Sequence, residues 1–389
     1  MRASLLIFSA LLASLPPISC SHLSEEVVRS EMTRSPQASW LDGMGGKLKW
    51  NYTTGLELLA MLEVYEKYGD ESILEYVDSW YDAIILEDGT PGANYKKSNY
   101  TLDHICPART VFKLYDLTGK EKYRLAMEVM MAQIKEQPRT PEGGFWHKKV
   151  YPGQMWLDGL YMAEPFYAEY TARYTWSPEA YEDIVGQFLL AARQCYDPST
   201  GLYRHAWDST REMFWCDPLS GQSAHAWGRA LGWFVMAMVE TLPFIPEQTA
   251  GREELLGIFR GIFERLPQYA DPQTGMWYQV LDCPGRDGNY VEATCSAMFT
   301  YSMLKGVRLG YLPESMGRYA RECYRALLDT FVRTGEDGLV ELTSCCSVAG
   351  LGGKENRSGD YDYYINEKVT SNDPKGIGPL VWAALEMER

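Results

Sequence analysis

The chain has 389 residues, of which 46% are hydrophobic and 23% charged, and its formal net charge is −15 at pH 7. This composition is typical of a folded globular protein, and the acidic balance argues against binding of nucleic acid, whose phosphates need a basic face. The same charge repels anionic ligands at long range, so an acidic ligand has to meet a local basic cluster. The candidate cations for such a cluster are Lys148, Arg204 and Arg229.

The N-terminus has the pattern of a cleaved export signal, with an apolar run over residues 5–15 and small residues before Cys20. We predict residues 1–19 as this signal and residues 20–389 as a single catalytic domain, exported to the periplasm or outer membrane of a bacterium. The segment before Cys20 is similar to a lipoprotein cleavage box. Pro17 departs from the usual pattern, so membrane attachment through a lipid at Cys20 stays open.

Apolar residues recur at helical spacing over most of the remaining chain, whereas strand-like alternation is short and rare. Tight turns join the helices in pairs, for example where Gly69 or Gly119 ends one helix and where Pro178 opens another. The predicted helices cover residues 24–33, 54–68, 71–84, 103–117, 121–136, 157–174, 178–196, 224–242, 252–268, 291–309, 314–333 and 375–388.

A glycine followed by a hydrophobic residue recurs after the second helix of several pairs, as at Gly201, Gly275 and Gly338. These glycines are separated by about 55 to 75 residues, which is the length of one helical hairpin with a long loop. Six such hairpins fit the chain, and closing them into a ring leaves no exposed end. We therefore predict an all-α fold, an (α/α)6 toroid with its long loops at one mouth. An open solenoid is the alternative.

Cysteine and histidine spacing indicates neither a disulfide framework nor a metal site. The nine cysteines are scattered, and Cys345 and Cys346 are adjacent without C-x-x-C spacing. The five histidines show neither H-E-x-x-H nor the spacing of a zinc site. We expect no metal and no organic cofactor.

Two aspartates lie at the starts of predicted helices. Asp103 is in the loop 99–104, where it is either a carboxylate at the mouth or, like Thr101, a cap of the next helix. Asp158 lies among apolar and aromatic residues in the run 153–162, an environment that disfavours its charge and can hold it protonated near neutral pH. This is the setting of an acid catalyst, and the alternative is again a helix N-cap.

Aromatic residues gather in the loops and helix starts of the same region, a lining that suits carbohydrate because flat rings stack on sugars. His205 offers an imidazole that can bind substrate or tune a carboxylate, or it is a structural histidine. Arg229 lies between Trp227 and Trp233, which suits pairing with a carboxylate. Stacking of Arg229 on tryptophan for stability is the alternative.

Several motifs in order resemble glycoside hydrolase family 105, the unsaturated rhamnogalacturonyl hydrolases. They are Phe145-Trp146-His147-Lys148, Trp156-Leu157-Asp158-Gly159-Leu160-Tyr161-Met162, His205-Ala206-Trp207-Asp208, Trp227-Gly228-Arg229, Val291-Glu292-Ala293-Thr294-Cys295-Ser296-Ala297-Met298-Phe299 and Asn372-Asp373-Pro374-Lys375-Gly376. The resemblance runs from about Trp50 to the C-terminus. It implies the same toroid, and it favours Asp158 as the catalyst over Asp158 as a cap.

The resemblance implies hydration of a sugar whose C4=C5 double bond was left by a polysaccharide lyase. Asp158 donates a proton to C4 and then, as a carboxylate, helps to deprotonate the water that adds at C5. The remaining sugar, rhamnose by resemblance, is then released, as in pectin or rhamnogalacturonan degradation.

The resemblance also implies roles for other residues. Asp103 binds the unsaturated sugar and orients the water, while His205 and Arg229 contact its hydroxyls and carboxylate. Further substrate-binding residues are Trp227 and Trp233, as stacking walls, and Lys148, near the rim of the pocket. Residues 107–109 and 230–231 depart from the family pattern, which leaves the identity of the neighbouring sugar open.

Two other functions remain open from the residues alone. A conventional inverting glycosidase would use two carboxylates, such as Asp103 and Asp158, on either side of an intact sugar. A non-catalytic sugar-binding toroid needs the aromatic lining but no acid.

Overall fold

The computed structural model describes residues 22–92 and 94–389. The predicted export signal and Cys20 lie outside the described residues. Within them, no helix is both long enough and apolar enough to cross a membrane. The eight cysteines of this part of the chain form no disulfide.

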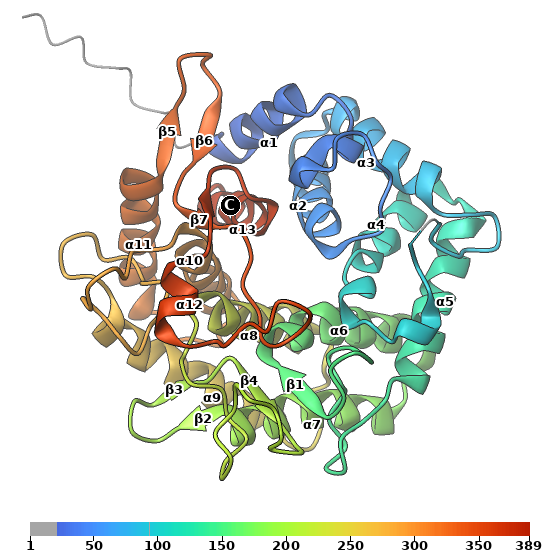
Figure 1. The fold of residues 1–389 in the computed structure, drawn as a ribbon. Coiled ribbons are helices and arrows are strands. Elements are labelled where there is room, and N and C mark those ends of the chain that lie inside the picture. Colours follow the sequence, from blue (N-terminus) through green and yellow to red (C-terminus); the bar gives the residue numbers. More distant parts are fainter. Residues whose placement is uncertain (1–21, 93) are drawn as a thin grey trace, which may run out of the picture.

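Helices form two concentric layers around a central axis (Figure 1). The inner layer consists of α2 (Tyr52–Tyr68), α4 (Ala108–Thr118), α6 (Leu157–Tyr170), α8 (Gly228–Thr241), α10 (Ala293–Arg308) and α13 (Pro374–Met387). The outer layer consists of α1 (Leu23–Arg34), α3 (Glu71–Ile84), α5 (Glu121–Glu136), α7 (Pro178–Cys195), α9 (Arg252–Arg265) and α11 (Met316–Phe331). The (α/α)6 toroid predicted from the helical repeats is confirmed.

The ring closes where the two ends of the chain meet. The last helix, α13, packs against both α10 and α2, and α1 covers α13 from the outside (Figure 1). Ser24 at the start of α1 donates from its hydroxyl to Glu388, just beyond α13, at 2.5 Å. The alternative of an open solenoid is therefore wrong.

Most inner helices are more completely buried than the outer ones, because neighbours cover them on all sides; α4, with its exposed Asp116, is the exception. Every residue of α8 is buried, and the same holds for most of α2, α6, α10 and α13. In α11 only one face is buried, as expected for an amphipathic surface helix. Continuous apolar helices in this chain are thus signals of the inner layer.

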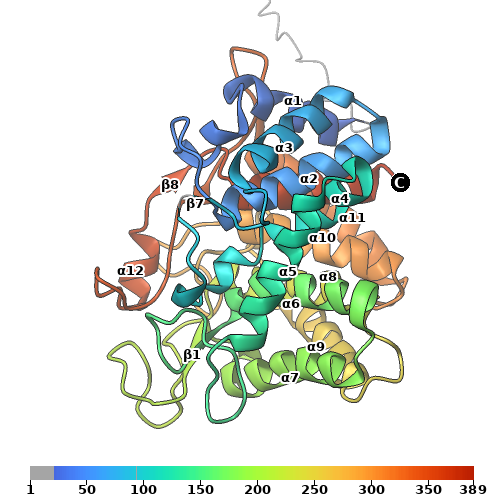
Figure 2. The same ribbon diagram turned by 90° about the vertical axis from the view of Figure 1, so that its right-hand side faces the viewer.

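Short strands and turns occupy the loops between the helices. Four antiparallel pairs are present in the described residues: β1 (Gln154–Trp156) with β4 (Ala206–Asp208), β2 (Tyr196–Asp197) with β3 (Leu202–Tyr203), β5 (Val332–Thr334) with β6 (Val340–Leu342), and β7 (Cys345–Cys346) with β8 (Val369–Thr370). A short helix, α12 (Tyr361–Ile365), lies with β1, β7 and β8 along one edge of the molecule in Figure 2. This edge carries the long loops.

Two of the glycine landmarks close the same kind of turn. Gly201 and Gly275 each donate their backbone N–H at 2.7 Å to the carbonyl of an aspartate four residues earlier, Asp197 and Asp271. Both glycines have φ of 73°, a left-handed conformation that residues with a Cβ atom rarely adopt. The repeat seen in the sequence is thus a repeated turn.

The predicted helix over residues 103–117 is the clearest difference in boundaries. The chain forms a single 3-10 turn, Leu102–His104, and α4 begins only after Pro107. Proline is tolerated at the start of a helix but not within it, because it lacks an N–H and its ring clashes with the preceding turn. Asp103 is consequently in a turn outside the helix.

A buried group of charges crosses the ring toward the C-terminal ends of α8 and α10. Glu240 accepts from Arg109 at 2.8 Å, from Lys305 at 2.7 Å and from the hydroxyl of Tyr301. Arg109 also donates to the hydroxyl of Tyr161 at 2.8 Å. Burial by itself raises the pKa of Glu240, but Lys305 and Arg109 outweigh it and lower this pKa to about 2.

Replacement of Glu240 by Gln is expected to lower the free energy of unfolding by about 3–5 kcal/mol, because it leaves the buried Arg109 and the partly buried Lys305 without this negative partner. Chemical denaturation at pH 7 measures this loss. The control is Glu136→Gln, which removes an exposed partner of Lys97 and should leave stability nearly unchanged.

The difference in stability between wild type and Glu240→Gln should depend on pH. The native pKa of Glu240 lies below its ordinary value of 4.5, so the stability from its charge is complete above about pH 4.5 and is lost as the pH falls toward about 2. The difference between wild type and Glu240→Gln should therefore shrink below pH 4.5. A difference that stays constant down to pH 3 would contradict this assignment.

Candidate functional site

The N-terminal ends of the inner helices face one mouth of the ring. Tyr52, at the start of α2, lies within electrostatic range of Asp158, Arg229 and Asp373 at three other helix starts, and of Asp103 in the turn before α4. A helix N-terminus carries a partial positive charge, so this mouth favours anions although the chain is acidic overall.

Asp158 is the second residue of α6 and is presented by the β1 and β4 pair. Trp156, which ends β1, pairs with Ala206, which begins β4, so His205 comes beside the start of α6. The backbone N–H of Leu157 donates to the carbonyl of His205 at 3.1 Å. As a result, Nε2 of His205 lies 3.2 Å from Oδ2 of Asp158.

The helix-cap interpretation of both aspartates is wrong. The N-cap of α6 is Trp156, and α4 has Pro107 in the same position. Neither helix has a side-chain cap, and Thr101 does not cap the turn that contains Asp103. Both carboxylates are therefore available for other contacts.

His205 is fully buried and is fixed by rings on several sides. Its ring centroid lies 4.8 Å from that of Trp227 and 5.3 Å from that of Trp156, which meets it edge-on. Nδ1 of His205 lies 2.7 Å from the hydroxyl of Tyr364 in α12. A continuous chain of polar contacts thus runs from Tyr364 through His205 to Asp158.

Two opposing effects set the charge of Asp158. Burial raises its pKa, but the imidazole of His205, together with His147 and a backbone hydrogen bond, outweighs burial and holds the pKa below its ordinary value. At 3.2 Å, Nε2 of His205 is close enough to Oδ2 of Asp158 for the imidazole to favour the carboxylate form of Asp158.

The prediction of an Asp158 that is protonated near neutral pH is therefore wrong for the protein without substrate. The apolar neighbours that suggested it are present, since Trp156, Leu157 and Leu160 are buried. Their effect on the pKa of Asp158 is outweighed mainly by the imidazole of His205, which is more than forty residues away in the sequence. Asp158 is a carboxylate until something changes its surroundings.

Asp103 belongs to a second charged group at the mouth. Its Oδ2 lies 2.5 Å from Nζ of Lys148, and its Oδ1 lies 3.5 Å from Nε2 of His147. Burial raises the pKa of Asp103, but Lys148 and His147 lower it below its ordinary value. The side chains of Asp103 and Lys148 are 17% and 24% exposed, so both can be reached from solvent.

His147 lies between the two carboxylates and is held by stacking. Its ring lies 4.6 Å from that of Trp156, at an interplanar angle of 11°, and Trp156 stacks in turn on Tyr151. Burial lowers the pKa of His147 to about 4, although Asp103 and Asp158 both favour its protonation. His147 is neutral at physiological pH and can polarise a bound water without adding charge.

Arg229 is buried to 99% at the start of α8. Its guanidinium lies 4.7 Å from the ring of Trp227 and donates to the carbonyl of Cys346, while its Nε has no hydrogen-bond partner. Burial disfavours its charge, but Cys346, Asp373 and Glu292 outweigh this and raise its pKa. Arg229 stacks on tryptophan, as the structural alternative expected, and keeps an unused donor.

Trp227 and Trp233 do not line the mouth as stacking walls. Each is 1% exposed. Trp227 holds His205, and Trp233 packs on Tyr161 at 4.7 Å and on Tyr52 at 6.3 Å. The structure therefore corrects this part of the prediction, because both rings support other site residues from behind.

Arg204, the third candidate cation, pairs with aspartates away from Asp103 and Asp158. It binds Asp197 at 2.5 Å and Asp282 at 3.0 Å. Of the other two candidates, Lys148 lies beside Asp103, and Arg229 lies within electrostatic range of Tyr52 at the same mouth.

Tyr52 and Tyr364 were missed by the sequence analysis. Tyr52 is half-buried, and burial together with nearby carboxylates raises its pKa although Arg229 opposes this. Tyr364 is buried in a short helix far from the other site residues in sequence. The local sequence around these two tyrosines does not distinguish them from the other tyrosines of the chain.

One group of side chains in the described residues has the geometry to hold a metal ion, His225 with Asp282 and Cys283. It does not include Asp158 or Asp103.

Comparison with known proteins supports a relationship over nearly the whole chain. The family model described as Glycosyl Hydrolase Family 88 matches residues 23–389. A structure of a family 105 glycoside hydrolase from C. acetobutylicum is 40% identical with a TM-score of 0.89, covering 94% of this chain and 99% of that one.

Two of the relatives found by sequence cover different shares of the chain. A protein of Agrobacterium fabrum, Atu3128, is 41% identical over 234 residues, which is 58% of this chain and 97% of that protein. The unsaturated rhamnogalacturonyl hydrolase YesR of Bacillus subtilis is 28% identical over 301 residues, 76% of this chain and 79% of that enzyme.

Replacement of His205 by Gln is expected to raise the pKa of Asp158 above its ordinary range, because burial remains while the ring that opposes it is removed. Carboxyl ¹³C NMR of aspartate-labelled protein measures this shift. As a matched control, Lys148→Met should raise the pKa of Asp103 and leave that of Asp158 low. An Asp158 pKa unchanged by His205→Gln would contradict the pairing.

Proposed function

The chain belongs to glycosyl hydrolase family 88 and to the family 105 glycoside hydrolases, as its motifs suggested, and from this membership we propose its substrate and chemistry. The enzyme acts on oligosaccharides that carry a 4,5-unsaturated uronic acid at the non-reducing end and releases that sugar. The observation that carries this proposal is the pair of the partly exposed Asp158 and the buried His205 at the mouth, beside Asp103 and Lys148.

Charge at the mouth supports an anionic substrate. The uronate carboxylate would meet helix N-termini together with Lys148 and the unused donor of Arg229. These local charges oppose the net charge of −15 at short range. The half-buried Tyr52 offers a hydroxyl at the same mouth.

The reaction begins with transfer of a proton to C4. Asp158 is ionised before substrate binds, but a bound uronate brings a second negative charge and excludes water, and both effects raise the pKa of Asp158. The proton that the Asp158/His205 pair holds then moves to the carboxyl group and from there to C4. The resulting positive charge at C5 is spread onto the ring oxygen.

Water then adds at C5. Asp158, again a carboxylate, accepts one proton from this water, so the pair regains the proton that it donated. The carboxylate of Asp103 accepts a hydrogen bond from this water, and the neutral imidazole of His147 beside it helps to orient the water. The hemiketal opens, the C1 glycosidic bond breaks, and one water is consumed in each cycle. The similarity to YesR makes rhamnose the first candidate for the neighbouring sugar.

Replacement of Asp158 by Asn is expected to reduce turnover by about 10²–10⁴-fold, because one residue supplies the acid and then the base. Loss of the ultraviolet absorbance of the conjugated double bond reports the rate on lyase-generated oligosaccharides. Asp116→Asn, an exposed aspartate on α4 bound to Arg173, is the matched control and should keep full activity. Full activity in Asp158→Asn would refute the assignment.

The alternatives differ from hydration in the fate of C4. In deuterium oxide, hydration places deuterium at C4, whereas conventional glycosidic cleavage leaves C4 unlabelled. Product analysis by mass spectrometry therefore separates the proposed reaction from that of an inverting glycosidase. A sugar-binding toroid without catalysis would release no product.

Tyr364 is expected to act as a positioning residue through His205. In Tyr364→Phe, a protonated His205 ring has no partner for its Nδ1–H, so the Asp158/His205 pair loses its shared proton at lower pH. The alkaline limb of the kcat/KM profile should move to lower pH, with a fall of about tenfold in kcat and little change in KM. Tyr363→Phe, the adjacent tyrosine, is the control. An unchanged pH profile would exclude this role.

A further inference from the structure

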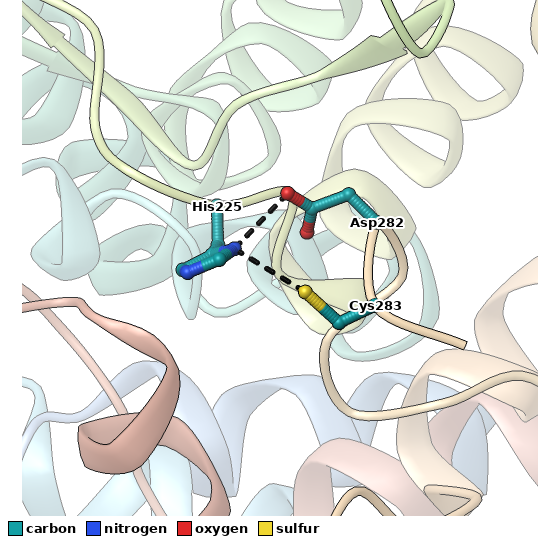
Figure 3. A group of neighbouring side chains, drawn as sticks. All are labelled: His225, Asp282 and Cys283. Atoms are coloured by element: carbon teal, nitrogen blue, oxygen red, sulfur yellow. Dashed lines mark hydrogen bonds and ion pairs between the residues drawn. The ribbon is translucent and has the colours of Figure 1, made fainter. Parts of the chain in front are cut away.

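Three side chains that the proposed reaction does not use meet near α12. His225 lies in the loop before α8, and Asp282 and Cys283 lie in the loop before α10 (Figure 3). Nδ1 of His225 lies 3.0 Å from Oδ2 of Asp282 and 3.8 Å from Sγ of Cys283. The three atoms all lie within 4.8 Å of one another.

The backbone around this group holds the two loops together. Oδ1 of Asp282 accepts the backbone N–H of Ala226 at 3.1 Å, and the N–H of Leu281 donates to the carbonyl of Ala226 at 2.9 Å. Asn289 donates to the carbonyl of Cys283 at 2.8 Å. The donor atoms are therefore positioned by their surroundings rather than by chance contact of mobile side chains.

The arrangement is not that of a nucleophile with its base. In a triad, the histidine uses one ring nitrogen for the nucleophile and the other for the carboxylate. Here the thiol of Cys283 and the carboxylate of Asp282 approach the same nitrogen of His225 (Figure 3). Nitrogen, oxygen and sulfur atoms that converge on one point are instead a donor set for a metal ion.

The distances fit a small tetrahedral ion. Zinc bonds of about 2.0–2.3 Å to nitrogen, oxygen and sulfur place neighbouring ligand atoms about 3.4–3.6 Å apart. The present separations of 3.0 and 3.8 Å lie on either side of this range, within reach of small side-chain rotations. All three residues are partly exposed, so an ion can enter from solvent.

Two arginines oppose a cation at this site: Arg286, which interacts with the thiol of Cys283, and Arg204. Arg204 lies 3.0 Å from the same Oδ2 of Asp282, and it also binds Asp197 at 2.5 Å. A carboxylate oxygen can accept a hydrogen bond and bind a metal together, and ligating carboxylates are commonly held this way. Asp197 neutralises much of the charge of Arg204, so Arg204 can orient Asp282 without preventing metal binding.

We propose that His225, Asp282 and Cys283 form a binding site for one zinc-type divalent ion, with a fourth position open to water. The thiolate favours zinc or cobalt over calcium and magnesium. On binding, the Cys283 thiol releases its proton to solvent. Sequence spacing predicted no metal site, because His225 is 57 residues from Asp282 and no short motif records the contact.

Cobalt is the probe for this site in the full chain, purified without an affinity tag and treated with chelator and reductant. Co²⁺ should bind one per chain and produce a thiolate-to-cobalt charge-transfer band, and Zn²⁺ should displace it. Cys283→Ser should lose the band and bind Zn²⁺ at least about tenfold more weakly by calorimetry. Cys216→Ser is the matched control, since this half-exposed thiol lies near Asp208 without a histidine partner.

A second measurement needs no substitution. Zn²⁺ should protect Cys283, but not Cys216, from alkylation in the unaltered chain, as mapped by peptide mass spectrometry. Absence of the cobalt band in the reduced wild type, or equal alkylation of Cys283 with and without Zn²⁺, would overturn the proposal. Neither readout depends on turnover, so failure here leaves the role of Asp158 untouched.

Discussion

Closure of the ring by α13 against α2 is the constraint on which the molecule depends. Inner helices such as α8 and α13 are buried along nearly their whole length, so each needs neighbours on both flanks as well as an outer helix. Once the ring is closed, the helix starts share one mouth. Partial positive charge from the helices, and side chains that are far apart in sequence, then meet in one place.

Charge inside this apolar ring is tolerated because it is paired. Glu240 has two cations and a tyrosine hydroxyl around it, and Asp103 has Lys148. Asp158 differs, since its partner is a histidine that can itself hold or give up a proton. Burial and the ring of His205 act on Asp158 in opposite directions. The state of the proton can therefore change with the charge of a bound molecule, which a solvated carboxylate would not allow.

Different loops at the mouth position different residues of the site. The β1 and β4 pair sets the distance between Asp158 and His205, and α12 brings Tyr364 to the far side of the imidazole. Behind them, Trp227 supports both His205 and Arg229. This explains why aromatic residues near the site are so often buried. They fix the orientation of the polar groups in front of them.

The sequence by itself determined the helices, their pairing and the ring, because these depend on local periodicity and on turn residues such as Gly201 and Gly275. It also proposed Asp103, Asp158, Lys148, His205 and Arg229 as site residues, through motifs that lie within short segments.

Only the tertiary structure decided how those residues are charged and which face solvent. The low pKa of Asp158, the burial of Trp227 and Trp233, and the contacts of Tyr52 and Tyr364 all depend on segments distant in the chain. So does the meeting of His225 with Cys283. Burial and electrostatic partners are properties of the closed ring, and no pattern of neighbouring residues records them.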